Sequence, residues 1–146
     1  MKSVIALGLA MLLVAQIFRN AEAKMTIAQV TNMLMPMRKT CIQKLGVNAD
    51  LVDAPKTGPM PDDSGLKCYY ACLMKMIKVL TKEGLPNPDS MLKQMDVMLP
   101  ADDTTARLKE VIGICKPAVT SSESCEASWQ FVKCFYETDR DVCFFP

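Results

Sequence analysis

Cysteines are the residues of this 146-residue chain whose type and spacing could do chemistry. Six of the seven are separated by 27, 4, 43, 10 and 9 residues, at Cys41, Cys68, Cys72, Cys115, Cys125 and Cys134. Cys68 and Cys72 lie one turn apart on one face of a predicted helix, too far for the roughly 3.8 Å between β-carbons that a disulfide needs. Cys125 and Cys134 point to opposite sides of another predicted helix. These exclusions leave ten of the fifteen possible pairings open. The cysteine pattern as a whole is typical of a helical protein stapled by disulfides.

The N-terminal residues have the pattern of a secretory signal peptide. Lys2 precedes an apolar run of about 15 residues, and positions 21–23 read Ala-Glu-Ala, a small-x-small cleavage site. The run is shorter than the ~20 residues that span a bilayer, which disfavours a membrane anchor. We therefore expect a signal peptide over residues 1–23 and one mature domain over 24–146. Export to an oxidising compartment would explain the cysteines.

The composition excludes several functions. Residues 24–146 carry equal numbers of basic and acidic side chains and no basic run with interleaved aromatics, so we expect no nucleic-acid partner. The chain has no histidine, which argues against hydrolase triads and dyads and against an enzyme in general. Cys-x-x-x-Cys without histidine also fits zinc poorly where thiols oxidise. We expect no metal and no cofactor.

Apolar periodicity and capping residues predict helices around these cysteines. Three signals predict the helices: apolar residues that recur at three- and four-residue steps, N-cap residues, and prolines at helix starts. The predicted helices span 25–45, 48–54, 63–81, 88–98, 102–115 and 123–138. Pro36 should bend the first of them, and Ser122 should cap the last. No strand is predicted. The expected fold is all-α, a compact bundle of about six helices.

Methionines and a terminal aromatic pair suggest a cavity inside this bundle. Ten of the 12 methionines fall within residues 24–146, mostly on inward faces, where they could line an adaptable cavity or form an ordinary core. The chain ends in Phe144-Phe145-Pro146. Two aromatic residues in a tail favour its folding back as a cavity wall, although an exposed end is the alternative.

The cysteine order resembles the six-cysteine signature of insect odorant-binding proteins, the pheromone and general odorant-binding family. The resemblance spans the whole mature chain and includes the strings Gly65-Leu66-Lys67-Cys68-Tyr69-Tyr70-Ala71-Cys72, Cys125-Glu126 and Lys133-Cys134-Phe135. It implies a helical bundle around one apolar cavity, with the disulfides Cys41–Cys72, Cys68–Cys125 and Cys115–Cys134.

The resemblance also implies site residues. The tail resembles the medium-length tails of dipteran members, which lie over the cavity as a lid, with the Pro146 carboxylate latched by Tyr69 and Arg38. Alternatively, Arg38 is a solvated surface charge and Tyr69 a core residue. Cys143 lies outside the six-cysteine pattern and is either a free, a glutathionylated or an intermolecular thiol. The expected ligand contacts are Ile27, Val30, Leu34, Met37, Tyr69, Tyr70, Leu73, Met76, Ile77, Met91, Met95, Leu108, Ile112, Trp129, Val132, Phe144 and Phe145.

The resemblance implies a carrier rather than a catalyst. We expect a secreted protein of the sensillum lymph, a monomer or weak homodimer, that carries a small hydrophobic volatile or lipid-like ligand, with an odorant receptor as a candidate partner. Tyr69, Tyr70 or Thr26 would supply one orienting hydrogen bond. The alternatives are a carrier outside olfaction and a secreted helical interaction module that dimerises through Cys143.

Overall fold

The structure, a computed structural model, describes residues 24–146, so the expected signal peptide lies outside the described residues. Within these residues, six α-helices follow one another: α2 Ile27–Leu45, α3 Ala49–Asp53, α4 Ser64–Met76, α5 Pro88–Met98, α6 Asp103–Cys115 and α7 Ser124–Thr138. Three short 3₁₀ helices follow α3, α6 and α7, at Ala54–Lys56, Lys116–Ala118 and Arg140–Val142. Residues 24–146 contain no strand, only an isolated bridge between Leu80 and Pro86. The all-helical prediction is confirmed.

Polar caps set where the helices begin. Thr26 forms a capping box with Gln29, and the side chains of Asn48, Asp63, Asn87 and Asp102 accept backbone hydrogen bonds at the starts of α3 to α6. Each cap satisfies a backbone donor that has no partner inside the helix.

The cap of α7 differs from the prediction. Glu123, not Ser122, is the N-cap, and its carboxylate accepts hydrogen bonds from the backbone N–H groups of Cys125 and Glu126. These bonds lower the pKa of Glu123, the bond from Glu126 being the stronger cause. A carboxylate at a helix N-terminus also suits the helix dipole. The sequence has this glutamate directly after a serine-rich turn, but serine is the more common N-cap residue, so Ser122 was the expected cap.

The end of α4 also differs from the prediction, because the helix stops at Met76 and not near Thr81. Lys78 takes the left-handed conformation, φ 60°, and the backbone N–H of Val79 donates to the carbonyl of Met74 at 3.0 Å. This is the arrangement of a Schellman cap, with lysine where glycine is usual. The chain therefore leaves the helix early, and Val79 turns back into the core.

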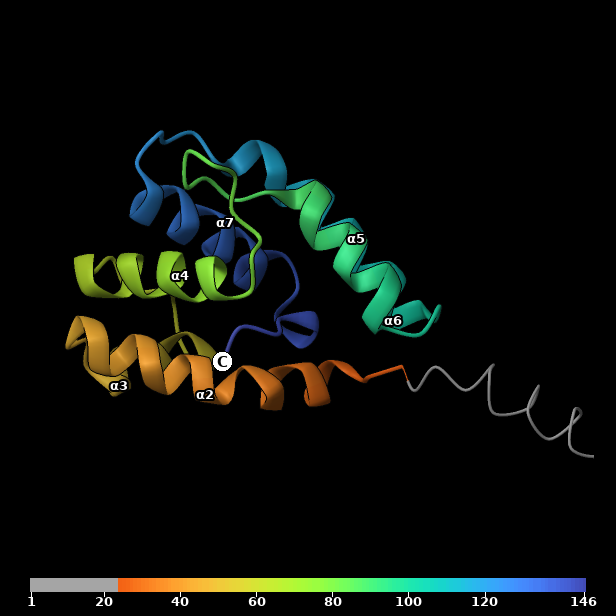
Figure 1. Cartoon of the computed structure of the whole chain (residues 1–146), viewed down its shortest axis with the longest axis horizontal. Helices are drawn as coiled ribbons and strands as arrows, with labels where there is room; N and C mark the ends of the chain where they lie inside the picture. Colours follow the sequence, from red (N-terminus) through yellow and green to blue (C-terminus); the bar gives the residue numbers. More distant parts are fainter. Residues whose placement is uncertain (1–23) are drawn as a thin grey trace, which may run out of the picture.

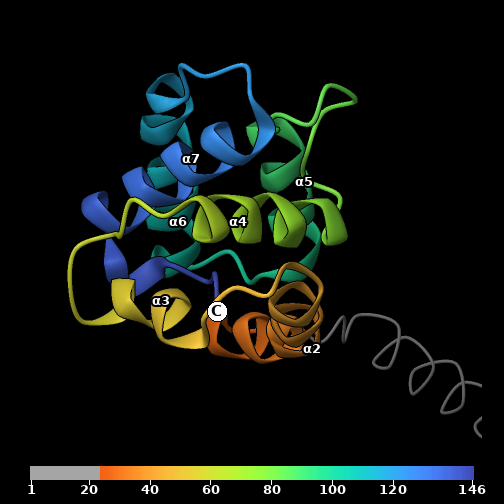
Figure 2. The same cartoon turned by 90° about the vertical axis from the view of Figure 1, so that its left-hand side faces the viewer.

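The helices pack in a fixed order. Helix α4 lies between α2 and α7, while α6 packs against both α5 and α7. Figures 1 and 2 show this arrangement from two sides, and in both views the C-terminal end lies beside α2. The α4–α7 contact is the most extensive, and both helices carry large buried side chains such as Tyr70, Leu73 and Phe131, each no more than 1% exposed.

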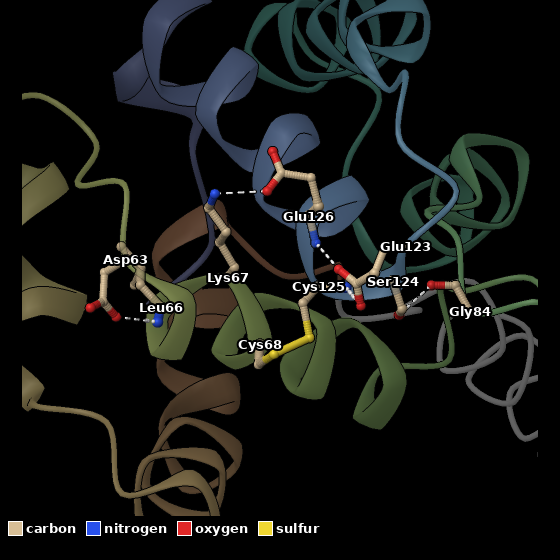
Figure 3. The surroundings of a disulfide bond; sticks show 9 residues. All are labelled: Asp63, Leu66, Lys67, Cys68, Gly84, Glu123, Ser124, Cys125 and Glu126. Atoms are coloured by element: carbon tan, nitrogen blue, oxygen red, sulfur yellow. Dashed lines mark hydrogen bonds and ion pairs between the residues drawn. A yellow bond between two sulfur atoms is a disulfide. The ribbon is translucent and has the colours of Figure 1, made fainter.

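Three disulfides join packed helices, α2 to α4, α4 to α7 and α6 to α7. They are the pairs that the family resemblance implies: Cys41–Cys72, Cys68–Cys125 and Cys115–Cys134. Figure 3 shows the second of them between α4 and α7, with an ion pair from Lys67 Nζ to Glu126 Oε2 at 2.7 Å joining the same two helices. The disulfides thus hold α2, α4, α6 and α7 together, whereas α5 contains no cysteine and is held by packing.

Candidate ligand-binding cavity

An apolar cavity of about 230 Å³ lies on the side of the bundle where α2 faces α5. Its wall is formed by α2, the end of α4, α5, α6 and the C-terminal tail, through Ile27, Val30, Met33, Leu34, Met37, Ile77, Val79, Met91, Gln94, Met95, Met98, Leu99, Leu108 and Phe144. All but Gln94 are apolar. The volume is below the roughly 300–1,000 Å³ typical of sites for drug-sized ligands, which suits a small molecule.

Helical periodicity explains how α2 and α5 build this wall. Val30, Leu34 and Met37 follow at steps of four and three residues on α2, and Met91 and Met95 lie one turn apart on α5. Five of the lining side chains are methionines. Because methionine is flexible and polarizable, such a wall can adapt to guests of different shape.

Two residues that precede α2, Lys24 and Met25, hydrogen-bond to α5, which also borders the cavity. The backbone N–H of Met25 donates to the carbonyl of Met98 at 2.8 Å, and Lys24 Nζ donates to the carbonyl of Val97 at 2.6 Å. Residues 24–25 are thereby tied to the last turn of α5. These bonds hold the start of α2 against α5.

The structure brings nine of the expected ligand contacts into the cavity wall. They are Ile27, Val30, Leu34, Met37, Ile77, Met91, Met95, Leu108 and Phe144.

Eight expected contacts lie outside this wall: Tyr69, Tyr70, Leu73, Met76, Ile112, Trp129, Val132 and Phe145. Leu73, Ile112 and Val132 are fully buried in the bundle core instead. Met76 is 38% exposed, and its sulfur lies 3.6 Å from that of Cys41. An inward-facing position therefore does not distinguish the packed core from the cavity.

The aromatic residues outside the wall have other partners. The hydroxyl of Tyr70 donates to the sulfur of Met60 at 3.7 Å, and Trp129 Nε1 donates to the carbonyl of Pro61 at 2.9 Å. Both contacts fasten the loop between α3 and α4. Burial raises the pKa of Tyr70, so this hydroxyl stays protonated.

Five lining residues were not among the expected ligand contacts: Met33, Val79, Gln94, Met98 and Leu99. Met98 and Gln94 continue the helical spacing of Met91 and Met95, and that periodicity could have identified them. Met33 is 43% exposed and lies at the edge of the wall. Val79 reaches the cavity only because α4 ends early.

Three side-chain hydroxyls fasten the tail, each donating to a main-chain oxygen of one of its last three residues. Thr31 of α2 donates to Phe144 O at 3.3 Å, Tyr136 of α7 to Phe145 O at 3.2 Å, and Tyr69 of α4 to Pro146 O at 2.5 Å. Burial raises the pKa values of Tyr69 and Tyr136, so both remain donors at physiological pH. The tail is thus held against three helices, and Phe144 and Phe145 are 5% and 2% exposed.

Arg38 does not take part in this fastening. Its Nη2 pairs with Asp53 Oδ2 at 2.6 Å, while Tyr69 alone binds Pro146. The residue is only 9% exposed, so it is not a solvated surface charge either. The reason lies in α3, whose last residue is Asp53 and whose packing brings this carboxylate to α2. Hydrogen bonds from Lys56 and then from Arg38 lower the pKa of Asp53.

Cys143 is the free thiol of the described chain. Burial raises its pKa to about 12. A thiol with so little thiolate is a poor nucleophile at neutral pH, which disfavours an intermolecular disulfide.

Residues 24–146 contain no cluster of three or more side chains suited to a metal ion. The same residues include no helix with the length and apolarity needed to cross a bilayer.

Comparisons with known proteins agree with this geometry. A profile of the PBP/GOBP family matches residues 23–138. General odorant-binding protein 72 of Anopheles gambiae is 32% identical over 108 residues, 73% of this chain and 88% of that protein. The structure of Apis mellifera odorant binding protein 5 superposes with a TM-score of 0.73 at 30% identity, covering 84% of this chain and 99% of that one. Odorant Binding Protein 4 of Chrysopa pallens gives a TM-score of 0.72 at 28% identity, with the same coverage.

The family match covers most of the chain, and the disulfides, helices and apolar cavity are those that the resemblance implies. Members of this family are ligand-binding carriers. The chain belongs to the PBP/GOBP family of odorant-binding proteins.

Proposed function

We propose that this protein carries one small apolar volatile molecule, such as an odorant or pheromone, in the cavity between α2 and α5 and delivers it to a membrane receptor. The observation that carries the proposal is the wall itself, in which 13 of 14 side chains are apolar and five are methionines. Such a wall has no group able to make or break a bond, so the protein would act by binding alone.

The expected affinity follows from the apolar surface that a ligand buries. A ligand with about 250 Å² of apolar surface gains roughly 6 kcal/mol at about 25 cal/mol per Å², before ordering costs are subtracted. Micromolar binding is therefore expected, and picomolar binding is not. Weak binding suits a carrier that must also release its ligand.

The delivery role requires export. We propose that residues 1–23 are a signal peptide, that cleavage follows Ala23, and that residues 24–146 act in an extracellular fluid such as sensillum lymph. The match of the family profile from residue 23 onward supports this division. A carrier in saliva or haemolymph would have the same sequence features, so the tissue of expression separates the two.

The tail is proposed to act as a lid over the cavity. Phe144 is part of the cavity wall, and the hydroxyls of Thr31, Tyr136 and Tyr69 hold the last three residues in place. Opening of the tail would expose the ligand to solvent along this wall.

A displacement assay tests the carrier function. The mature protein, residues 24–146, is titrated with a fluorescent apolar probe, which is then displaced by volatile alcohols, esters, aldehydes and terpenoids. We expect saturable probe binding at one site per chain and displacement at micromolar concentrations. No probe uptake by the folded protein would refute the carrier and favour an interaction module with a filled core.

A further inference from the structure

One polar side chain interrupts the otherwise apolar cavity wall. Gln94 lies on α5 between Met91 and Met98, on the helix face that borders the cavity. Helix α5 could place methionine or leucine here with equal helix propensity. A glutamine in this position puts an amide at the surface that the ligand contacts.

The orientation of this amide is fixed by a neighbouring carbonyl. Gln94 donates through Nε2 to the carbonyl oxygen of Ile77 at 3.1 Å. A carbonyl can only accept, so the NH₂ group must face Ile77. Ile77 is the C-cap residue of α4, where carbonyl groups have no partner inside the helix. The bond therefore holds Gln94 in the wall.

The other half of the amide has no partner. Oε1 of Gln94 accepts no hydrogen bond from any residue between 24 and 146, and the side chain is half-buried. The three polar residues expected to orient a ligand are engaged elsewhere: Thr26 in its capping box, Tyr69 with Pro146 and Tyr70 with Met60. Gln94 Oε1 is thus an unpaired side-chain acceptor on a residue that lines the cavity.

We infer that Gln94 makes the cavity selective for ligands with a hydroxyl group, such as alkanols, over ethers of the same size. The inference rests on the proposed function of the cavity. A hydroxyl donates to Oε1 and replaces the water that this oxygen loses when the ligand enters. An ether has no donor and leaves the oxygen buried and unpaired, which is costly.

Two isomeric ligands and two variants test this. Calorimetric affinities for 1-octanol and heptyl methyl ether, both C8H18O, are measured on the wild type, on Gln94→Met and on Met91→Leu. We expect the wild type to prefer the alcohol by about three- to tenfold, the net value of one hydrogen bond. Gln94→Met should lose this preference, mainly through weaker alcohol binding. Met91→Leu alters the wall without altering its polarity and should keep the preference.

A second measurement needs no variant. The side-chain amide resonances of Gln94 in the ¹⁵N spectrum of the wild type should shift on addition of 1-octanol and stay nearly unchanged with the ether at equal occupancy. Equal affinity of the wild type for both ligands, or an undiminished preference in folded Gln94→Met, would overturn the role of Gln94. Failure of the wild type to bind the alcohol, the ether and the fluorescent probe would overturn the carrier function itself.

Discussion

Phe144 and Phe145 are neighbours in the tail with nearly equal burial, yet only Phe144 lines the cavity. Both rings pack against Phe135, at centroid distances of 6.0 and 6.1 Å, but the ring of Phe145 also packs against Tyr70 at 6.3 Å, outside the cavity wall. Truncating each to alanine should therefore separate ligand binding from stability. Each truncation removes a buried aromatic ring and should lower the free energy of unfolding by about 3–5 kcal/mol.

The effect on binding should fall on Phe144→Ala alone. Phe144 is the sole aromatic residue of the wall, and we take it to cover about a fifth of a ligand with about 250 Å² of apolar surface. At about 25 cal/mol per Å² this covered area is worth about 1.3 kcal/mol, close to a tenfold change in Kd. Phe145→Ala should change Kd by less than twofold.

The assay combines two measurements on both variants. Urea unfolding gives the loss of stability, and displacement of the fluorescent probe by 1-octanol gives the affinity under conditions where each variant is fully folded. Equal losses of affinity in the two variants, or the larger loss in Phe145→Ala, would refute the assignment of Phe144 as the lid residue that faces the ligand.

Three further predictions concern a disulfide, the thiol and pH. Replacing Cys41 and Cys72 by serine releases a 31-residue loop and should lower the free energy of unfolding by about 3–4 kcal/mol in the chain-entropy model; a loss below about 1 kcal/mol in urea unfolding would contradict it. Cys143 should react with iodoacetamide at pH 8 at least about tenfold more slowly in the folded than in the urea-unfolded protein, because burial raises its pKa to about 12; equal rates would show an accessible thiol. The chain has no histidine that could titrate near pH 6. The pKa of Asp53 is lowered, so its ion pair with Arg38 stays intact at neutral pH. The stabilisation from this pair is lost only when pH falls below the ordinary carboxyl range near about 4. Probe affinity should therefore change little between pH 7.5 and 5.5, and a sharp release near pH 6 would contradict this.

Local signals predicted most of the fold. Asn87 with Pro88, and Asp102, mark helix starts that the structure reproduces, because a cap acts on the backbone donors of its own first turn. The end of α4 was not predicted because its left-handed residue is Lys78, and a lysine gives no sequence signal for a positive φ. Sequence signals thus predict a helix end only where the residue with positive φ is one that favours it.

The cavity was only partly predictable. Val30 and Leu73 occupy equivalent inward positions on α2 and α4, but Val30 borders the cavity and Leu73 packs in the filled core. The difference depends on how far α5 lies from α2, which no local pattern records. The partner of Arg38 was missed for the same reason, because Asp53 reaches it only through the packing of α3.

Methyl NMR of the methionines tests the central claim most directly. Residues 24–146 contain ten methionines, of which Met33, Met37, Met91, Met95 and Met98 line the cavity. Met60 and Met74 are buried, at 9% and 0% exposed, but lie outside it, and they serve as internal controls. With ¹³C-methyl labelling, titration of 1-octanol should shift the five lining methyl resonances with one common Kd in the micromolar range and leave those of Met60 and Met74 in place. Shifts confined to the two control methionines, or none at saturating alcohol, would contradict binding in the cavity between α2 and α5.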